Sequence, residues 1–318
     1  MTLLKFLLIG IGPKEQLKSH NIKPVISKPG VGANLQDHIM IVIDALSKNE
    51  NSLGLNVFLA SNPLNYFKWF TSNPYNGPLG DTAISSGAFI HTDFDTKDPY
   101  KRPPIQLISL PFYTLFDWAA IYSAILNYSE EYQKLSEDYF GKDGMTFLPG
   151  LLRPKSRGTI KLRSADYRDH PIIDPEYLKH PDDVNTLVSA LKIVKSLFDS
   201  KAFKEAKIEP LLNPLCKKHT AWSDDYYKCV VQNNVMTTYH PVGTCKMGSK
   251  SDPMAVVDPN LKVIGINNLR VIDASVMPRV VGGNTNAATV MIGEKGSSII
   301  LEEHGVKTEK KTIPKTEL

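Results

Sequence analysis

The chain has 318 residues, of which 42% are apolar and 22% charged, so it can bury a large core and predicts one or two globular domains. Its formal net charge of +4 is small for this length, which argues against nucleic acid as a partner. No segment approaches the apolar length that a transmembrane helix needs. The three cysteines lack a CxxC spacing and a histidine pair at metal-ligand distance, so neither a metal site nor a disulfide framework is expected.

The amino-terminal stretch MTLLKFLLIGIG suggests two features, and its residues oppose both. Lys5 interrupts the apolar run and no small-residue cleavage site follows, which argues against a signal peptide. The GIG motif lacks the third glycine of a dinucleotide fingerprint, and Glu15 would repel a pyrophosphate from the first helical turn. The stretch therefore predicts only a turn into a short helix from Pro13 to about His20.

The middle of the chain carries strand and helix signals in turn. A short strand and a Pro-Gly loop are expected in KPVISKPGVGANLQDH, and one β-branched strand in IMIVIDALS. Helices are expected over 63–70, with Leu64, Phe67 and Trp69 or Phe70 on a buried face, and over 115–139. RGTIKLRSAD alternates as a half-buried strand does, and the run that opens at Pro181 repeats apolar residues at helical spacing.

The last third changes character. AVVDPNLKVIGINNLRVIDASVMP predicts two short strands around Gly265, the second of which ends in Asp273-Ala274-Ser275. Polar residues at the carboxyl end of an apolar strand lie where open α/β sheets bind ligands. A helix follows, with Val290, Met291, Ile299 and Ile300 on its expected buried side. Asn284 or Asn286 would cap this helix, or else its first amides are left for an electron-rich ligand, and the sequence leaves both possibilities open.

One histidine stands in a stiff corner, in the stretch TTYHPVGTCKMG. Pro241 pushes His240 towards an extended backbone, and Gly243 allows a turn or a close approach. Isolated from its context, such a histidine is more often a hydrogen-bonded structural residue than a catalytic one. Cys245 lies five residues on, but a nucleophilic Cys-His pair requires a spatial geometry that the spacing does not establish.

Six blocks in order carry a family resemblance: IGPKEQL, GVGANLQDH, RPKSRGTIKLRSAD, YHPVGTCKMG, LRVIDASVMP and GGNTNAATVMIGEK. Together they resemble the glucose-methanol-choline (GMC) family of FAD-dependent oxidoreductases, in particular its animal glucose dehydrogenase and choline dehydrogenase branch. The resemblance implies a mixed α/β fold. It consists of a partial FAD-binding α/β domain over 1–40 and 235–305, a substrate domain with a mixed or antiparallel sheet flanked by helices over 41–234, and a polar, disordered tail over 306–318.

The resemblance also assigns the chemistry. It implies that His240 acts as general base on an alcohol hydroxyl while the carbinol carbon passes hydride to the flavin, and that Asn284 holds the substrate oxygen. Asp273 and Ala274 fall near the diphosphate and ribityl chain of FAD, and the backbone of Asn284 and Thr285 near the edge of its ring system. The expected partners are an alcohol or sugar substrate and an electron acceptor, quinone or oxygen. Neither the substrate nor the acceptor can be identified further.

The chain departs from the family pattern at its amino terminus, where family members carry a strand, a GxGxxG turn and a helix that hold the ADP part of FAD. We therefore expect a carboxyl-terminal portion that binds FAD weakly or not at all by itself. The alternative function is a catalytically inactive remnant that serves as a binding or interaction module. A sequon at Asn127 and the final KTEL favour secretory or extracellular localisation.

Overall fold

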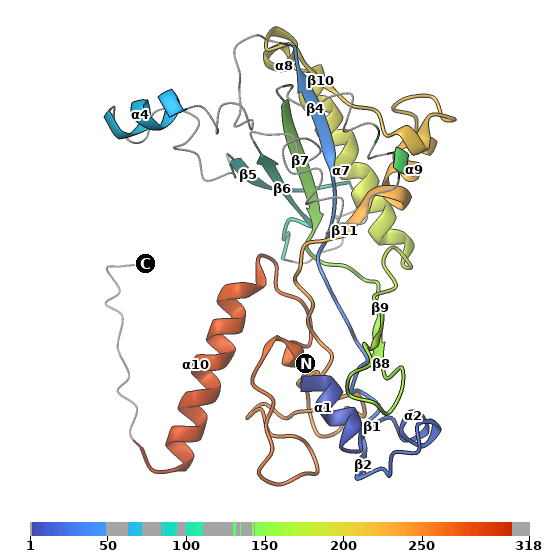
Figure 1. The fold of residues 1–318 in the computed structure, drawn as a ribbon, viewed down its shortest axis with the longest axis vertical. Coiled ribbons are helices and arrows are strands. Elements are labelled where there is room, and N and C mark those ends of the chain that lie inside the picture. Colours follow the sequence, from blue (N-terminus) through green and yellow to red (C-terminus); the bar gives the residue numbers. More distant parts are fainter. Residues whose placement is uncertain are drawn as a thin grey trace. The chain divides into compact units, whose positions relative to one another are not determined.

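The computed structural model describes residues 2–48, 63–71, 84, 86–93, 100–110, 130, 131, 134, 142 and 144–306 (Figure 1). Two compact units make up the chain. The first comprises Met1–Asp37, Arg157–Glu176 and His240–Leu318, and the second comprises His38–Ser156 and Tyr177–Tyr239. The first unit thus takes in one segment, residues 157–176, that the expected FAD-binding ranges do not contain.

The first unit has little regular structure apart from one long helix. Its elements are α1 (Thr2–Leu8), β1 (Ile11–Gly12), α2 (Lys14–Ser19), β2 (Ile26–Ser27), β8 (Thr159–Lys161), β9 (Ile172–Asp174), the short 3-10 helix η3 (Ala274–Val276) and α10 (Thr285–Glu303). β1 and β2 pair in parallel, whereas β8 and β9 are antiparallel. Leu7, Leu17 and Val256 are completely buried in the core of this unit.

Among the described residues, the second unit is built on an antiparallel sheet of seven strands. Its central path is β10 (Ile208–Pro210), β4 (Ile43–Ser47), β7 (Gly144–Leu151), β3 (Ile39–Ile41) and β11 (Val235–Thr237), and β7 also pairs with β6 (Ile105–Leu110), which pairs with β5 (Ser86–Ile90). The remaining elements are α4 (Pro63–Thr71), α7 (Pro181–Asp199), α8 (Lys201–Glu205), the 3-10 helix η2 (Pro214–Cys216) and α9 (Asp224–Asn234).

Helix α7 shows how the sequence builds this unit. Pro181 occupies the first helical position, where its missing N–H is not needed, and the Nδ1 atom of His180 accepts a hydrogen bond of 3.2 Å from the Asp182 amide. Leu187 and Leu191 then recur on one face and are buried in the same cluster as Ile41 of β3. The expected helix is therefore confirmed, and it lies along the sheet in Figure 1.

Two expectations about the middle of the chain are wrong. The stretch IMIVIDALS forms two strands, β3 and β4, which are separated at Val42, where the carbonyl accepts a hydrogen bond of 2.7 Å from Asn234 Nδ2. Helix α4 exists, but Leu64, Phe67 and Phe70, which were expected on its buried face, are exposed. The helix expected over 115–139 lies almost entirely outside the described residues.

The cysteines also differ from expectation, because Cys216 and Cys229 form a disulfide between η2 and α9. Their separation of 13 residues matches no disulfide motif, and the pairing depends on how η2 packs against α9. A cysteine pair brought together by tertiary packing leaves no signal in the spacing. Cys245 is free and buried, and burial raises the pKa of its thiol to about 11, so it is not a thiolate nucleophile at neutral pH.

Candidate active site

His240 is held by its backbone, at the start of the carboxyl-terminal segment of the first unit. Tyr239 precedes it with a φ of 60°, and the His240 amide donates a hydrogen bond of 2.9 Å to Asp37 Oδ1. Asp37 is 6% exposed, so this bond is formed in a largely water-free position. The imidazole is therefore carried on a backbone whose direction is fixed by a buried carboxylate.

The residues that follow His240 are fixed to the segment around Asn34. Gln36 and Val242 exchange backbone hydrogen bonds of 3.0 and 2.8 Å in an antiparallel bridge. Gly243 has a φ of +95°, and a Cβ atom there would lie 2.5 Å from the Asn34 carbonyl oxygen. Only glycine fits this turn without displacing backbone, which explains the glycine of the HPVGT motif.

Asn284 occupies the N-cap position of α10, but its side chain makes no capping hydrogen bond. Its Nδ2 atom instead lies 3.4 Å from His240 Nε2. In the tautomer that carries its proton on Nδ1, the imidazole accepts this hydrogen bond through the lone pair of Nε2. The two side chains predicted from the sequence are therefore neighbours, and the capping role left open for Asn284 is not the one that its side chain performs.

Burial and charge act in opposite directions on the imidazole of His240. Partial burial lowers the pKa of His240, and the nearby carboxylate of Asp37 raises it, with burial as the larger effect. The net shift of the pKa is downward, so the neutral ring persists to lower pH than in an exposed histidine. A neutral imidazole can accept a proton, which is what a general base must do.

We expect a titration of His240 by NMR to give a pKa below the ordinary histidine value, and Asp37→Asn to lower this pKa further. The substitution removes the negative charge, while the amide oxygen can still accept the hydrogen bond from the His240 backbone. Asp258→Asn, which removes an equal charge elsewhere in the same unit, serves as the control and should leave the midpoint in place. An upward move of the midpoint in Asp37→Asn would contradict this account.

The other predicted residues lie on η3 and at the start of α10. The Asp273 carboxylate accepts a hydrogen bond of 2.8 Å from the Ser275 amide and a second one from its hydroxyl, which caps η3 and includes Ala274 in its turn. Thr285 is the first residue of α10 and is buried. No side-chain acceptor caps α10, so its first amides are open to another acceptor.

Sequence reasoning missed Asp37. In the block GVGANLQDH, the His38 ring lies 3.1 Å from the Leu152 carbonyl oxygen, whereas the neighbouring Asp37 accepts the hydrogen bond from the His240 amide. In the sequence, the signal for Asp37 was an aspartate next to a histidine. This pair is too common in proteins to identify a functional residue without knowledge of the fold.

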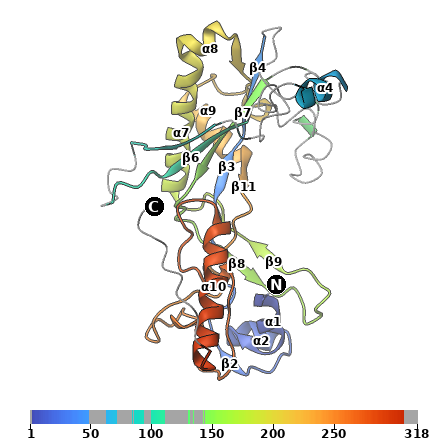
Figure 2. The same ribbon diagram turned by 90° about the vertical axis from the view of Figure 1, so that its left-hand side faces the viewer.

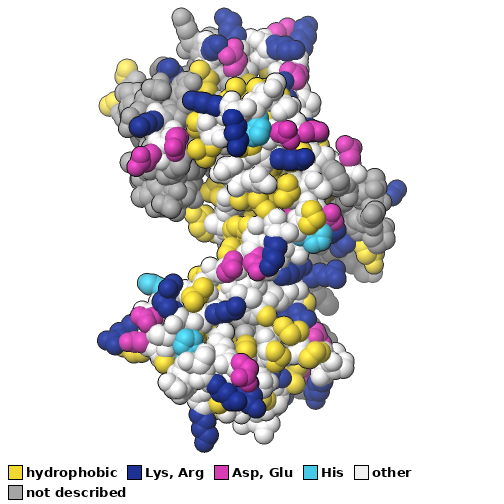
Figure 3. Space-filling view, turned by 90° about the vertical axis from the view of Figure 1, so that its right-hand side faces the viewer, with side chains coloured by type: hydrophobic (Ala, Val, Ile, Leu, Met, Phe, Trp, Pro, Cys, Tyr) yellow, Lys and Arg dark blue, Asp and Glu magenta, His cyan; other side chains and the backbone are white. Residues whose placement is uncertain are grey.

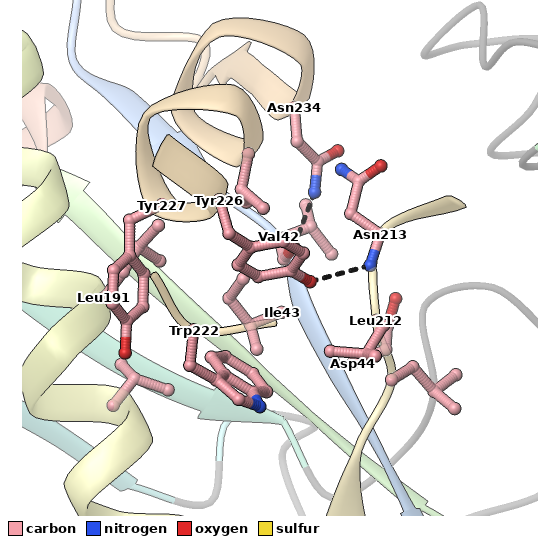
Figure 4. Close-up of a pocket in the computed structure, with 13 residues that line it drawn as sticks. Val42, Ile43, Asp44, Leu191, Leu212, Asn213, Trp222, Tyr226, Tyr227 and Asn234 are labelled. Atoms are coloured by element: carbon pink, nitrogen blue, oxygen red, sulfur yellow. Dashed lines mark hydrogen bonds between the residues drawn. The ribbon is translucent and has the colours of Figure 1, made fainter. Parts of the chain in front are cut away.

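A cavity in the second unit offers no comparable chemistry (Figure 4). Its volume is about 20 Å³, which is room for roughly one water molecule. Tyr226 Oη accepts a hydrogen bond of 2.9 Å from the Asn213 amide at its wall, and the Asn213 Nδ2 atom is buried without a partner among the described residues. An ordered water suits this cavity, and an alcohol or sugar substrate does not fit.

Other site types find no support in the described residues. None of the described groups of His, Cys, Asp and Glu side chains has the arrangement of a metal site, and none of the described helices is both long and apolar enough to cross a membrane. On the face in Figure 3, basic and acidic side chains are interspersed rather than gathered by sign, which is unlike a nucleic acid interface.

Residues 154–293 match the family model described as GMC oxidoreductase. These residues belong to the GMC oxidoreductase family. The whole chain is 35% identical over 299 residues to an alcohol dehydrogenase [acceptor] of Pseudomonas putida, with 93% of this chain and 49% of the relative aligned. It is 34% identical over 308 residues to a glucose dehydrogenase [FAD, quinone] of Drosophila melanogaster, with 95% of this chain and 45% of that relative aligned.

Solved structures agree with this assignment at the level of the fold. A formate oxidase of Aspergillus oryzae has a TM-score of 0.76 to this chain at 24% sequence identity, over 96% of this chain and 53% of the oxidase. The mixed α/β fold expected from the family resemblance is thereby confirmed. The chain spans about half the length of the relatives and solved structures that it matches.

Proposed function

We propose that this GMC chain carries the catalytic base and the substrate-orienting amide of an FAD-dependent oxidoreductase that acts on CH–OH groups. The observation that supports this function is the pairing of His240 with Asn284. An asparagine at a helix N-cap ordinarily bonds to the first turn, but Asn284 directs its amide to the imidazole, 3.4 Å away. Because the side chain of Asn284 makes no capping hydrogen bond, a role outside the helix explains its position better.

The residues of the first unit fit part of an FAD site. The uncapped amides at Asn284 and Thr285 suit the electron-rich edge of an isoalloxazine ring, and a Cβ at Gly283 would meet nothing within 4 Å, so a ligand can approach there. Asp273 is a hydrogen-bond acceptor, which suits ribityl hydroxyls rather than a like-charged diphosphate. When bound, the flavin would serve as the acceptor of hydride from the carbinol carbon.

His240 and Asn284 then have different roles at the substrate hydroxyl, proton acceptance for His240 and orientation for Asn284. A bound alcohol would replace the direct hydrogen bond between these two side chains. Its oxygen would then accept a hydrogen bond from Asn284 Nδ2, and its proton would pass to the freed lone pair of His240 Nε2. The C–H electron pair leaves the carbinol carbon as hydride, and the carbon-oxygen bond becomes a carbonyl. Asp37 orients the backbone of His240 and lies close enough to stabilise the imidazolium that forms.

The relatives guide the choice of substrates to test. Their names mention alcohol, glucose and choline, with quinone or oxygen as acceptor in two of them. For this chain we propose an alcohol or sugar as substrate, with its hydroxyl held by His240 and Asn284 of the first unit.

The test joins the chain to the part of the Pseudomonas putida relative that lies outside the match. We expect a protein with a flavin absorption band that reduces a dye when supplied with a primary alcohol, glucose or choline, whereas the chain by itself shows little flavin. A joined protein without a flavin band contradicts the FAD assignment. A flavin band without oxidation of any of these compounds supports the inactive binding module instead.

A further inference from the structure

One polar side chain is buried between the segment that follows His240 and the segment that leads to Asn284. Gln36, in the block GVGANLQDH, is 2% exposed. Burying an amide costs free energy unless its donors and its acceptor are all paired, so a glutamine in this position needs a reason. Its hydrogen-bond partners come from these two segments and from Asn34, which points to a role in joining them.

The backbone of Gln36 holds the segment that carries His240. Gln36 and Val242 exchange two backbone hydrogen bonds, and Val242 is the second residue after His240. The neighbouring Asp37 accepts the hydrogen bond of the His240 amide. Two consecutive residues thus fix the backbone on either side of Pro241, and one of them has its side chain left for a second task.

The side chain of Gln36 holds the segment that leads to Asn284. Its Nε2 atom donates a hydrogen bond of 3.1 Å to the Pro278 carbonyl oxygen, and its Oε1 atom accepts one of 3.3 Å from the Val280 amide. Nε2 also donates to Asn34 Oδ1, 3.2 Å away. The segment therefore requires a side chain that ends in both a donor and an acceptor, which neither an apolar residue nor an ionised carboxylate provides.

The first turn of α10 depends on this segment for its position. Asn284 is the N-cap of α10, the helix that lies in front of the rest of its unit in Figure 2. Val290 and Met291 were expected on the buried side of this helix, but they are 58% and 57% exposed, so that expectation is wrong. Exposed side chains add little packing, so the buried hydrogen bonds of residues 278–280 have a larger part in placing Asn284.

We propose that Gln36 is a positioning residue for the proposed reaction, which joins the segment after His240 to the segment before Asn284 and so keeps the two side chains within hydrogen-bond distance. The inference rests on the proposed function for the roles of this pair. Gln36 acts through the backbone and needs no contact with the substrate. Such a residue matters because a displacement of about 1 Å at a reacting group can cost about 10²-fold in rate.

The experiment reads the pairing from the tautomer of His240. Because Asn284 Nδ2 donates to Nε2, the pairing favours the neutral ring that carries its proton on Nδ1, and the nitrogen NMR shifts of the imidazole distinguish the two tautomers. At a pH where the rings are neutral, we expect a larger Nδ1–H fraction at His240 than at the exposed His304 of the same chain. This difference is the tautomer excess, and Asn284→Ala should remove it.

The decisive variant is Gln36→Met, which keeps the length of the side chain but removes its donor and its acceptor. We expect it to lose about half or more of the tautomer excess, because Pro278 and Val280 lose their shared partner. Gln16→Met is the matched control. Gln16 accepts a hydrogen bond of 3.4 Å from the Leu162 amide in the same unit, and Leu162 belongs to neither segment, so the excess should stay as in the unchanged chain.

A milder variant serves if circular dichroism shows that Gln36→Met does not fold. Asn34→Gly removes one acceptor of Gln36 Nε2 and the hydrogen bond of 3.1 Å from Asn34 Nδ2 to the Gly243 carbonyl oxygen. Asn34 has a φ of 59°, which glycine adopts without strain, so the backbone turn is kept. We expect Asn34→Gly to lose a smaller share of the tautomer excess than Gln36→Met.

A tautomer excess that stays complete in folded Gln36→Met, or in Asn34→Gly where Gln36→Met does not fold, would overturn the proposal. The absence of an excess in the unchanged chain would overturn it as well. None of these measurements requires flavin or turnover. A reduced excess in Gln36→Met together with an inactive joined protein would therefore leave the positioning role standing and remove only the proposed function.

Discussion

Replacing Asp183 by alanine should lower the free energy of unfolding by about 4 kcal/mol, because two buried donors and one partly buried donor lose their acceptor at about 1–3 kcal/mol each. Asp183 is the third residue of α7, and it is 2% exposed. Its Oδ1 accepts a hydrogen bond of 2.8 Å from the Lys155 amide, and its Oδ2 accepts bonds of 2.8 and 2.6 Å from the amide and hydroxyl of Ser156. This carboxylate therefore joins the start of α7 to the segment that follows β7.

The neighbouring aspartate is the control for this prediction. Asp182 has the same charge and lies in the same helical turn, but its side chain is 46% exposed and its ion pair with Lys155 is on the surface. Exposed pairs contribute roughly 0–1 kcal/mol, so Asp182→Ala should have a small effect. Urea unfolding followed by circular dichroism measures both variants. Equal losses in the two variants would mean that α7 responds to acidic charge in its first turn and not to the buried contacts of Asp183.

Sequence patterns predicted correctly those elements whose ends are marked by particular residues and whose apolar face is covered within the same unit. Helix α7 has Pro181 at its start and an apolar stripe whose covering sheet lies in the same unit, so sequence periodicity and burial agree. The two short strands expected around Gly265 are different. The described chain has only isolated bridges there, such as Lys262 with Arg270. A strand requires a neighbouring strand, and a periodic sequence cannot supply one.

The candidate site could be predicted only in part for a related reason. The HPVGT and GGNTN blocks identified His240 and Asn284, and the geometry brings their side chains within 3.4 Å. Asp37, which holds the His240 backbone, lies 203 positions away in the sequence and carries no distinctive motif. Long-range contacts of single side chains leave little trace in one sequence. Periodicity and spacing are local properties, so they find blocks more readily than the residues that support them.

In the joined protein, His240→Ala should reduce turnover of the alcohol about 10²- to 10⁴-fold, the usual contribution of a positioned general base. The flavin band should remain, because the first amides of α10 and the backbone around Gly283 do not depend on the imidazole. Loss of the band together with turnover would assign His240 to cofactor binding instead.

The pH dependence separates a base from a structural histidine. If His240 takes the proton, kcat/KM falls on the acid side as the ring becomes protonated, and this fall lies below the ordinary histidine pKa because burial lowers the pKa of His240. The acid limb should move to still lower pH in Asp37→Asn and disappear from the residual activity of His240→Ala. His304→Ala, which changes an exposed histidine at the end of α10, is the matched control. It should keep both the turnover and the acid limb of the kcat/KM profile. An acid limb that survives in His240→Ala would mean that another group accepts the proton.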